Sequence, residues 1–191
     1  FDKDSVLSRF DMQLKSSGIK TKYTLNPDFS WAVVDVDNII NQYFGKKFIL
    51  LFPFCSPKLS HKKWPHYNHL IQIIKSHHKN IEIAIAPGPQ ELDDSKNINS
   101  IIIKNKNKAL TILELAGLIN KSSYVIANDT GPAHMAAHLG KKGIVLFGHH
   151  TTAKKVSIET NKFKAITTEN LNLLTAEQVY NQIKDKIELI N

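Results

Sequence analysis

Residues 124–139 read YVIANDTGPAHMAAHL, and this stretch decides the fold that we expect for the chain. Its first four residues form an apolar run, which is typical of a strand buried in a parallel sheet. Gly131 then permits a tight turn, and Pro132 suits a first helical turn because its missing N–H has no partner there. Either Asp129 or Thr130 can serve as the N-cap. The outward-pointing N–H groups and the positive end of the helix dipole predict an anion site, usually one for phosphate.

Strand and helix patterns alternate along most of the chain. Apolar runs predict strands at residues 48–53, 81–86, 101–103, 124–127, 143–147 and 164–167. Helical spacing predicts helices at residues 64–78, 111–120, 132–139 and 175–190, and at most a short one at 92–96. This alternation predicts an α/β fold, a Rossmann-like parallel sheet with helices on both faces. Ligands of such sheets bind beyond the carboxyl ends of the strands, so motifs that follow strands share one rim.

The first 45 residues differ in pattern from the remainder. Residues 5–14 have apolar side chains at helical spacing, and residues 37–44 predict another short helix. Residues 23–36, between them, are extended and rich in turn-forming residues. We therefore divide the chain into a connector at residues 1–45 and an α/β domain at residues 46–191.

Composition narrows the class of protein. The chain has 191 residues, of which 22% are charged and 42% hydrophobic, as in ordinary globular domains. No apolar run approaches the ~20 residues that span a bilayer, and no secretory signal pattern is present. The single cysteine, Cys55, excludes an internal disulfide framework. These features predict a cytoplasmic protein.

The net charge of +8 comes almost entirely from lysine. No RNP-type, zinc-finger or basic-heptad pattern accompanies it, so we expect no nucleic-acid partner. A basic surface still favours anionic small molecules and the anionic inner leaflet of a membrane.

Two further motifs follow predicted strands, FPFCSPKLSHKKWP at residues 52–65 and PGPQE at residues 87–91. Together with DTGPAHMAAHL at residues 129–139, they stand in the order found in family 9 glycosyltransferases, the ADP-heptose:lipopolysaccharide heptosyltransferases. The third motif resembles that family's signature. The first resembles its phosphate loop and Lys-x-Trp-Pro helix start, and the second its Gly-x-x-x-Glu turn. The resemblance extends from about Phe10 to the C-terminus.

This resemblance implies the C-terminal half of a GT-B glycosyltransferase, in which two α/β halves face each other across a cleft. The C-terminal half binds the nucleotide sugar, and the N-terminal half holds the acceptor and the catalytic base. The implied reaction is inverting transfer from ADP-heptose or a related donor to a lipopolysaccharide core acceptor at the cytoplasmic face of the inner membrane. Because the family's base is an aspartate of the other half, we assign no catalytic residue here. We expect this chain alone to bind nucleotide without transferring sugar.

The resemblance assigns four residues to the donor diphosphate. Lys62 occupies the lysine position of the Lys-x-Trp-Pro motif, although its neighbour Lys63 is a competing candidate. Ser56 resembles the hydroxyl of the phosphate loop, in a segment longer than usual. Thr130 and Gly131 would bind phosphate through their amides and the threonine hydroxyl, as the helix start itself predicts.

Asp129 and His134 are expected to contact the sugar. A carboxylate beside a diphosphate is electrostatically unfavourable, so we expect Asp129 to cap the helix or to bind sugar hydroxyls. His134 matches the family's histidine near the sugar. His138 lies four residues further on, but neither a metalloprotease glutamate nor an Asp-x-Asp motif is present. We expect no metal and no cofactor, the nucleotide sugar being a substrate.

Glu91 resembles the acidic residue that, in the family, accepts hydrogen bonds from both ribose hydroxyl groups. Leu110 and Leu113 lie where the family packs the adenine ring. One turn departs from the family pattern, since His149 and His150 replace the usual Pro-Thr pair. Whether these histidines contact the sugar stays open.

Two other functions also remain open at this point. One is a different GT-B enzyme, such as a UDP-sugar transferase or a sugar epimerase, which base preference would distinguish. The other is a nucleotide-binding module without transferase activity. Cys55 has no activating base beside it in the sequence, so we interpret it as a packing residue.

Overall fold

A computed structural model describes residues 4–45 and 47–189, and its centre is a six-stranded sheet. The strands lie in the order β3-β2-β1-β4-β5-β6, and neighbouring strands are parallel. The order reverses between β1 and β4, which confirms the predicted Rossmann-like α/β fold. The strands are β1 (Phe48–Phe52), β2 (Glu82–Ile85), β3 (Ile101–Ile102), β4 (Tyr124–Asn128), β5 (Gly143–Phe147) and β6 (Phe163–Thr167).

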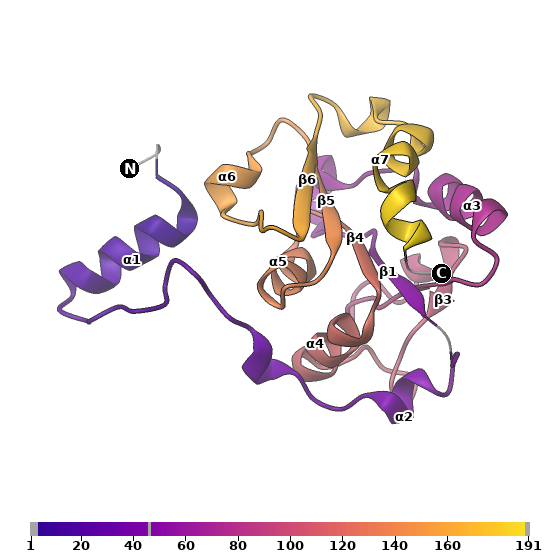
Figure 1. Cartoon of the computed structure of the whole chain (residues 1–191), viewed down its shortest axis with the longest axis horizontal. Coiled ribbons are helices and arrows are strands. Elements are labelled where there is room, and N and C mark those ends of the chain that lie inside the picture. Colours follow the sequence, from indigo (N-terminus) through magenta and orange to yellow (C-terminus); the bar gives the residue numbers. More distant parts are fainter. Residues whose placement is uncertain (1–3, 46, 190–191) are drawn as a thin grey trace.

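Helices cover both faces of the sheet (Figure 1). On one face, α3 (Tyr67–His77) and α7 (Ala176–Glu188) pack side by side, and on the other α4 (Ile112–Lys121) lies next to α5 (Gly131–His138). Shorter or peripheral helices are α1 (Val6–Ser16), α2 (Asp37–Ile40) and α6 (Ala153–Val156). Within the described part of the chain, no helix combines the length and apolarity that crossing a membrane requires.

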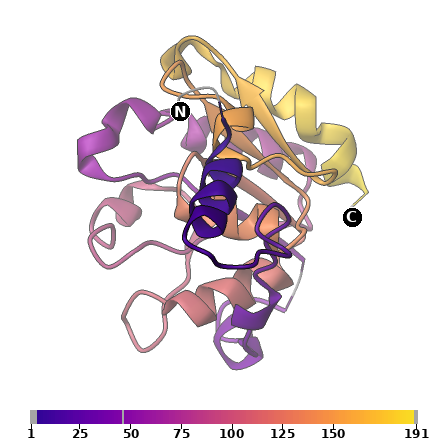
Figure 2. The same ribbon diagram turned by 90° about the vertical axis from the view of Figure 1, so that its left-hand side faces the viewer.

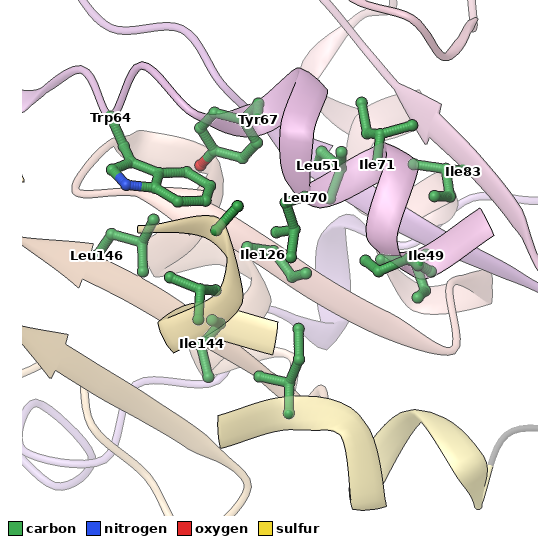
Figure 3. Packing of buried hydrophobic residues seen from close by; sticks show 14 of the residues in the cluster. Ile49, Leu51, Trp64, Tyr67, Leu70, Ile71, Ile83, Ile126, Ile144 and Leu146 are labelled. Carbon is green, nitrogen blue, oxygen red and sulfur yellow. The ribbon is translucent and has the colours of Figure 1, made fainter. Parts of the chain in front are cut away.

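Alternate residues of the strands point into two apolar layers. On the side of α3 and α7, Ile49, Leu51 and Ile126 pack with Leu70 and Ile71 (Figure 3). The intervening residues of β1 and β4 pack in the layer of α4 and α5. All residues of β1, β4 and β5 are buried, which explains why these strands are continuous apolar runs in the sequence.

Capping boxes fix the starts of α4 and α7. The hydroxyl of Thr111 accepts the backbone N–H of Glu114, whose carboxylate accepts the N–H of Thr111 in return. Thr175 and Gln178 form the same reciprocal pair. These pairs satisfy N–H groups that a helix start leaves without partners. The expected end of α7 at Ile190 lies outside the described residues.

The helix expected at residues 64–78 begins only at Tyr67, so the expectation that Trp64 and Pro65 lie inside it is wrong. Trp64 precedes a proline, which disfavours the helical conformation. Its indole Nε1 also donates to the carbonyl oxygen of Leu174 at 2.8 Å, which holds the residue outside the helix. A 3₁₀ turn at Pro57–Lys62 and the short α6 are present where no helix was expected.

The predicted connector has two parts in the structure. α1 lies apart from the sheet layers and approaches α6 (Figures 1 and 2). The chain then returns to the core, where Val36, Ile40 and Phe44 are buried in the layer of α4 and α5. Gly117 of α4 makes room for this return, because a Cβ there would lie 2.3 Å from the carbonyl oxygen of Val34. The second part of the connector is therefore packed against the α/β core.

The buried side chain of Asn128, at the end of β4, joins three segments. Its Nδ2 donates to the carbonyl oxygen of Pro53 at 2.9 Å, and its Oδ1 accepts the backbone N–H of Trp64 at 3.2 Å. The hydroxyl of Tyr67 lies 3.3 Å from the same Oδ1, and Figure 3 shows Trp64 and Tyr67 side by side. A buried amide needs such partners. They fix the ends of β1 and β4 relative to the loop that leads into α3.

Replacement of Asn128 by alanine is expected to lower the free energy of unfolding by about 2–4 kcal/mol. The change leaves the buried N–H of Trp64 and the carbonyl of Pro53 without their partner. Urea denaturation measures the effect, with Asn120→Ala at an exposed position of α4 as the matched control. Equal stability of the two variants would contradict the structural role of Asn128.

Candidate functional site

Two adjoining cavities open at the carboxyl edge of the sheet. The first has a volume of about 320 Å³ and the second a volume of about 310 Å³. Cys55 and Ser56 after β1, and Thr130 and Gly131 after β4, line both. The cavities therefore meet where the strand order reverses, which is the place that doubly wound sheets favour for ligands.

The first cavity is mainly apolar and contains one carboxylate. Leu110 and Leu115 line it together with Pro87 and Gly88. The Oε2 atom of Glu91 accepts the backbone N–H of Gly88 at 2.8 Å, which folds the carboxylate back into the lining. A Cβ on Gly88 would lie 3.3 Å from that oxygen and crowd it. An apolar cavity that contains a carboxylate suits a planar ring attached to a group with neighbouring hydroxyls: the ring packs against apolar side chains, and the hydroxyls donate to the carboxylate.

The two leucines predicted to pack an adenine ring lie in different environments. Leu110 lines the first cavity, whereas Leu113 is exposed and lies outside the lining. Leu115 lines the cavity in its place. Because positions two apart on a helix point in nearly opposite directions, only one of the pair 113 and 115 can face the cavity from α4.

The second cavity brings together charged and polar residues predicted from separate motifs. Lys62, Asp129 and His134 line it, together with the shared Ser56. Lys62 ends the 3₁₀ turn after β1, and its side chain is 20% exposed. Lys63, the competing candidate, is exposed and belongs to neither lining.

Three basic side chains surround the carboxylate of Asp129, which is only 4% exposed. Lys62 Nζ donates to Oδ2 at 2.6 Å, and His150 Nε2 lies 3.1 Å from the same oxygen. His134 Nε2 lies 3.6 Å from Oδ1. Burial by itself would raise the pKa of Asp129, but these contacts and the lysine charge outweigh it and hold the pKa below its usual range. Asp129 is therefore ionised at neutral pH.

The N-cap of α5 is Thr130 rather than Asp129, and its side chain makes no capping hydrogen bond. The Thr130 hydroxyl instead donates to the carbonyl oxygen of Asn128 at 3.3 Å. Apart from its two chain neighbours and the backbone of its own helix, no atom of the described residues lies within 4 Å of the position that a Cβ on Gly131 would occupy, so the space at the helix start is open. The first N–H groups of a helix lack intrahelical acceptors. With Lys62 beside them, they form an electropositive site of the kind that binds phosphate.

We interpreted Cys55 as a packing residue. In the structure it also lines both cavities. Burial raises the pKa of its thiol, which makes it a weak nucleophile. Two other candidate side chains lie outside the cavities, His138 at the end of α5 and the exposed His149, which contacts the carbonyl oxygen of Glu169. In residues 4–45 and 47–189, no group of three or more His, Cys, Asp or Glu side chains is placed to hold a metal ion.

The sequence left a sugar contact of His150 open but did not predict its contact with Asp129, and it gave Asn128 no role in the site. His150 lies in a turn without a local pattern, and only the folded sheet brings it to 3.1 Å from Asp129. Asn128 carried a usable signal, since an amide at the end of a buried apolar strand has to find hydrogen-bond partners.

A doubly wound sheet with an electropositive helix start at its reversal point is the architecture of nucleotide-binding α/β domains. Residues 5–183 match the family model of glycosyltransferase family 9 (heptosyltransferase), and the chain belongs to this family. Lipopolysaccharide core heptosyltransferase OpsX of Haemophilus influenzae is 30% identical over 112 residues, which cover 56% of this chain and 32% of OpsX.

Solved heptosyltransferase structures share the fold. The ADP-heptose lipopolysaccharide heptosyltransferase II of E. coli matches with a TM-score of 0.66 at 15% identity, over 82% of this chain and 54% of that one. E. coli heptosyltransferase WaaC with ADP-2-deoxy-2-fluoro heptose matches with a TM-score of 0.66 at 18% identity, over 92% of this chain and 54% of that one. The chain therefore spans about half the length of these structures and about a third of OpsX.

The lowered pKa of Asp129 predicts how stability depends on pH. The folded-state pKa lies below the unfolded value of about 3.9, so ionised Asp129 stabilises the fold above that pH. This contribution is lost as the pH falls through the folded-state pKa. The difference in unfolding free energy between the parent and Asp129→Asn should therefore be largest at neutral pH and shrink below about pH 4. Denaturant unfolding at several pH values measures it, and a difference that grows on acidification would contradict the ion pair.

Proposed function

We propose that this chain is the C-terminal, donor-binding half of an inverting, metal-independent heptosyltransferase-like enzyme. It would bind ADP-heptose or a related nucleotide sugar for transfer to a lipopolysaccharide core acceptor. The observation that carries the proposal is the meeting of two cavities at the start of α5, one lined by leucines and Glu91 and the other by the charged pair Lys62 and Asp129. Structures of WaaC with ADP and with ADP-2-deoxy-2-fluoro heptose share the fold, which supports a donor that contains ADP.

The first cavity suits the adenosine of such a donor. Leu110 and Leu115 would pack against the adenine ring, and Glu91 would accept the hydroxyl groups of the ribose. Because the Oε2 atom of Glu91 is held by Gly88, the carboxylate is oriented before a ligand arrives. Such orientation reduces the entropy lost on binding.

The diphosphate would lie at the junction of the cavities, against Ser56, Thr130, Gly131 and Lys62. When the sugar leaves, negative charge develops on the departing nucleoside diphosphate. The α5 N–H groups and the ammonium group of Lys62 would stabilise this charge, and they are in place before the reaction begins. This arrangement supplies electrostatic stabilisation through protein groups alone.

The sugar would occupy the second cavity, next to Asp129 and His134. Lys62 and His150 already contact Oδ2 of Asp129, whereas Oδ1 faces only His134 at 3.6 Å. Oδ1 can therefore accept a hydrogen bond from a hydroxyl group of the sugar. Inversion by a single displacement also needs a base on the acceptor side, which we assign to the other half of the enzyme.

We also propose that the protein works in the cytoplasm, at the inner face of the inner membrane, where it contacts the membrane peripherally. Its net charge of +8 favours both an anionic donor and an anionic leaflet.

The first test of this function is the binding of nucleotides to the 191-residue chain. ADP should bind more tightly than UDP or GDP, and magnesium should not be required. Lys62→Ala is expected to weaken ADP binding about 10- to 100-fold, because one charge-assisted hydrogen bond contributes about 1.5–3 kcal/mol. Isothermal titration calorimetry measures these affinities. Lys63→Ala, which alters an exposed neighbour outside both cavities, is the matched control and should bind ADP normally.

Other outcomes of this titration would point to the alternative functions. A preference for UDP would favour a UDP-sugar transferase or epimerase, and equal weakening by both lysine replacements would reflect overall charge rather than a site. Failure of the chain to bind any nucleotide would contradict the proposal that it is a donor-binding half.

We expect no catalytic turnover by the chain alone. Incubated with ADP-heptose and a lipopolysaccharide core acceptor, the chain should release no ADP above the uncatalysed rate, because the base belongs to the other half. A coupled assay for ADP, run at concentrations that saturate binding, measures this. Sugar transfer by the chain alone would show that it contains its own base.

A further inference from the structure

His150 is held by contacts on several sides next to Asp129, a residue that lines the second cavity. Its side chain is 8% exposed, and its ring stacks on that of Phe147, with centroids 5.9 Å apart and planes at 22°. The ring of His61 meets it edge-on, with centroids 5.3 Å apart. Its Nε2 atom lies 3.1 Å from Oδ2 of Asp129, the oxygen that also accepts a hydrogen bond from Lys62. Lys62 and His150 therefore share one carboxylate oxygen.

The surroundings of His150 determine which nitrogen carries its proton. An ionised carboxylate only accepts hydrogen bonds, so Nε2 must be the donor to Asp129. The Nδ1 atom is buried and has no hydrogen-bond partner, and a proton there would be stranded. His150 is therefore neutral with its proton on Nε2. Burial lowers the pKa of His150, and the charges of Lys62 and His61 act in the same direction, although Asp129 opposes them.

We propose that His150 is a positioning residue for donor binding: it holds Oδ2 of Asp129 so that Lys62 can turn its charge to the diphosphate. This inference rests on the proposed function of the site. In the proposed complex the ammonium group of Lys62 interacts with two anions. One is the buried carboxylate of Asp129, 2.6 Å away, and the other is the diphosphate of the donor. A buried carboxylate that loses its only partner is strongly destabilised. Because His150 remains as a second hydrogen-bond donor, the carboxylate of Asp129 keeps a partner when Lys62 also binds the diphosphate.

The same contact orients the carboxylate. With Oδ2 directed to His150 and Lys62, the other oxygen of Asp129 lies 3.6 Å from Nε2 of His134, which lines the second cavity as Asp129 does. Rotation of the carboxylate would remove Oδ1 from the place where a sugar hydroxyl can reach it. His150 thus acts on the donor through Asp129 and Lys62, and it does not itself line either cavity.

The test compares two replacements of His150 in ADP titrations. His150→Leu removes the donor and should weaken ADP binding about tenfold, which corresponds to one hydrogen bond to a charged group. His150→Gln keeps an N–H donor at a similar reach and should restore most of the affinity. His149→Leu, at the exposed neighbouring position, should leave binding unchanged.

A Lys62→Ala background separates positioning from a general loss of structure. If His150 acts through Lys62, His150→Leu should cause no further loss of ADP binding in that background, because the competition for the ammonium group no longer exists. The same tenfold loss with and without Lys62 would overturn the proposal. So would His150→Leu binding ADP as the parent does.

A measurement without ligand makes the result independent of how His150→Leu folds. Long-range ¹H–¹⁵N spectra of the unaltered chain at pH 7 should show a neutral His150 with its proton on Nε2. A proton on Nδ1 would overturn the proposal, because Nε2 could then not donate to Asp129. Absence of ADP binding by the parent chain would overturn the proposed function and this role with it, whereas normal binding that His150→Leu leaves unchanged would overturn only this role.

Discussion

The hydrogen bonds of the Asn128 side chain determine where the charged residues of the site lie. Asn128 ends β4 and accepts the N–H of Trp64, which lies two residues after Lys62. Asp129 is the residue next to Asn128. The bond that joins the two loops therefore also sets the distance between Lys62 and Asp129, which meet at 2.6 Å. An amide in the apolar core thus positions an ion pair at the rim.

Because of this arrangement, the partners of the Asp129 carboxylate are set by tertiary packing rather than by local sequence. Asp129 is buried, and an isolated buried carboxylate would be unstable. It is tolerated because Lys62 reaches it from the loop after β1 and His150 from the loop after β5. Each of these loops follows a strand that borders β4. The loops after three neighbouring strands thus contribute one polar or charged side chain each, and the parallel sheet brings them to the same edge.

The parts of the fold that could be predicted are those that local chemistry controls. The strands were recognisable because burial on both faces requires continuous apolar runs, and α4 and α7 began as expected because Thr111 and Thr175 cap them locally. The start of α3 was misplaced because a tertiary hydrogen bond holds the indole of Trp64 outside the helix. No sequence window contains its partner, Leu174, which is 110 positions away.

The site shows the same division. Residues on the strand–turn–helix motif could be placed because the turn is built by its own residues, Gly131 and Pro132. The choice between Leu113 and Leu115 depends on which side of α4 faces the cavity, and both are apolar residues at acceptable spacing. His150 could not be assigned to Asp129 because its contact arises only when β5 lies beside β4.

The buried ion pair affects which ligands the second cavity can accept. Lys62 and His150 donate hydrogen bonds to Oδ2 of Asp129, whereas Oδ1 has His134 at 3.6 Å and keeps capacity for another hydrogen bond. A second anion placed there would meet a carboxylate in surroundings of low polarity, where repulsion is strong. A neutral group with hydroxyl donors would instead complete the hydrogen bonding of Oδ1. Under the proposed function, the helix start at Gly131 would bind phosphate, and Asp129, two residues earlier, would favour an uncharged polyhydroxylated group attached to it, as in a nucleotide sugar.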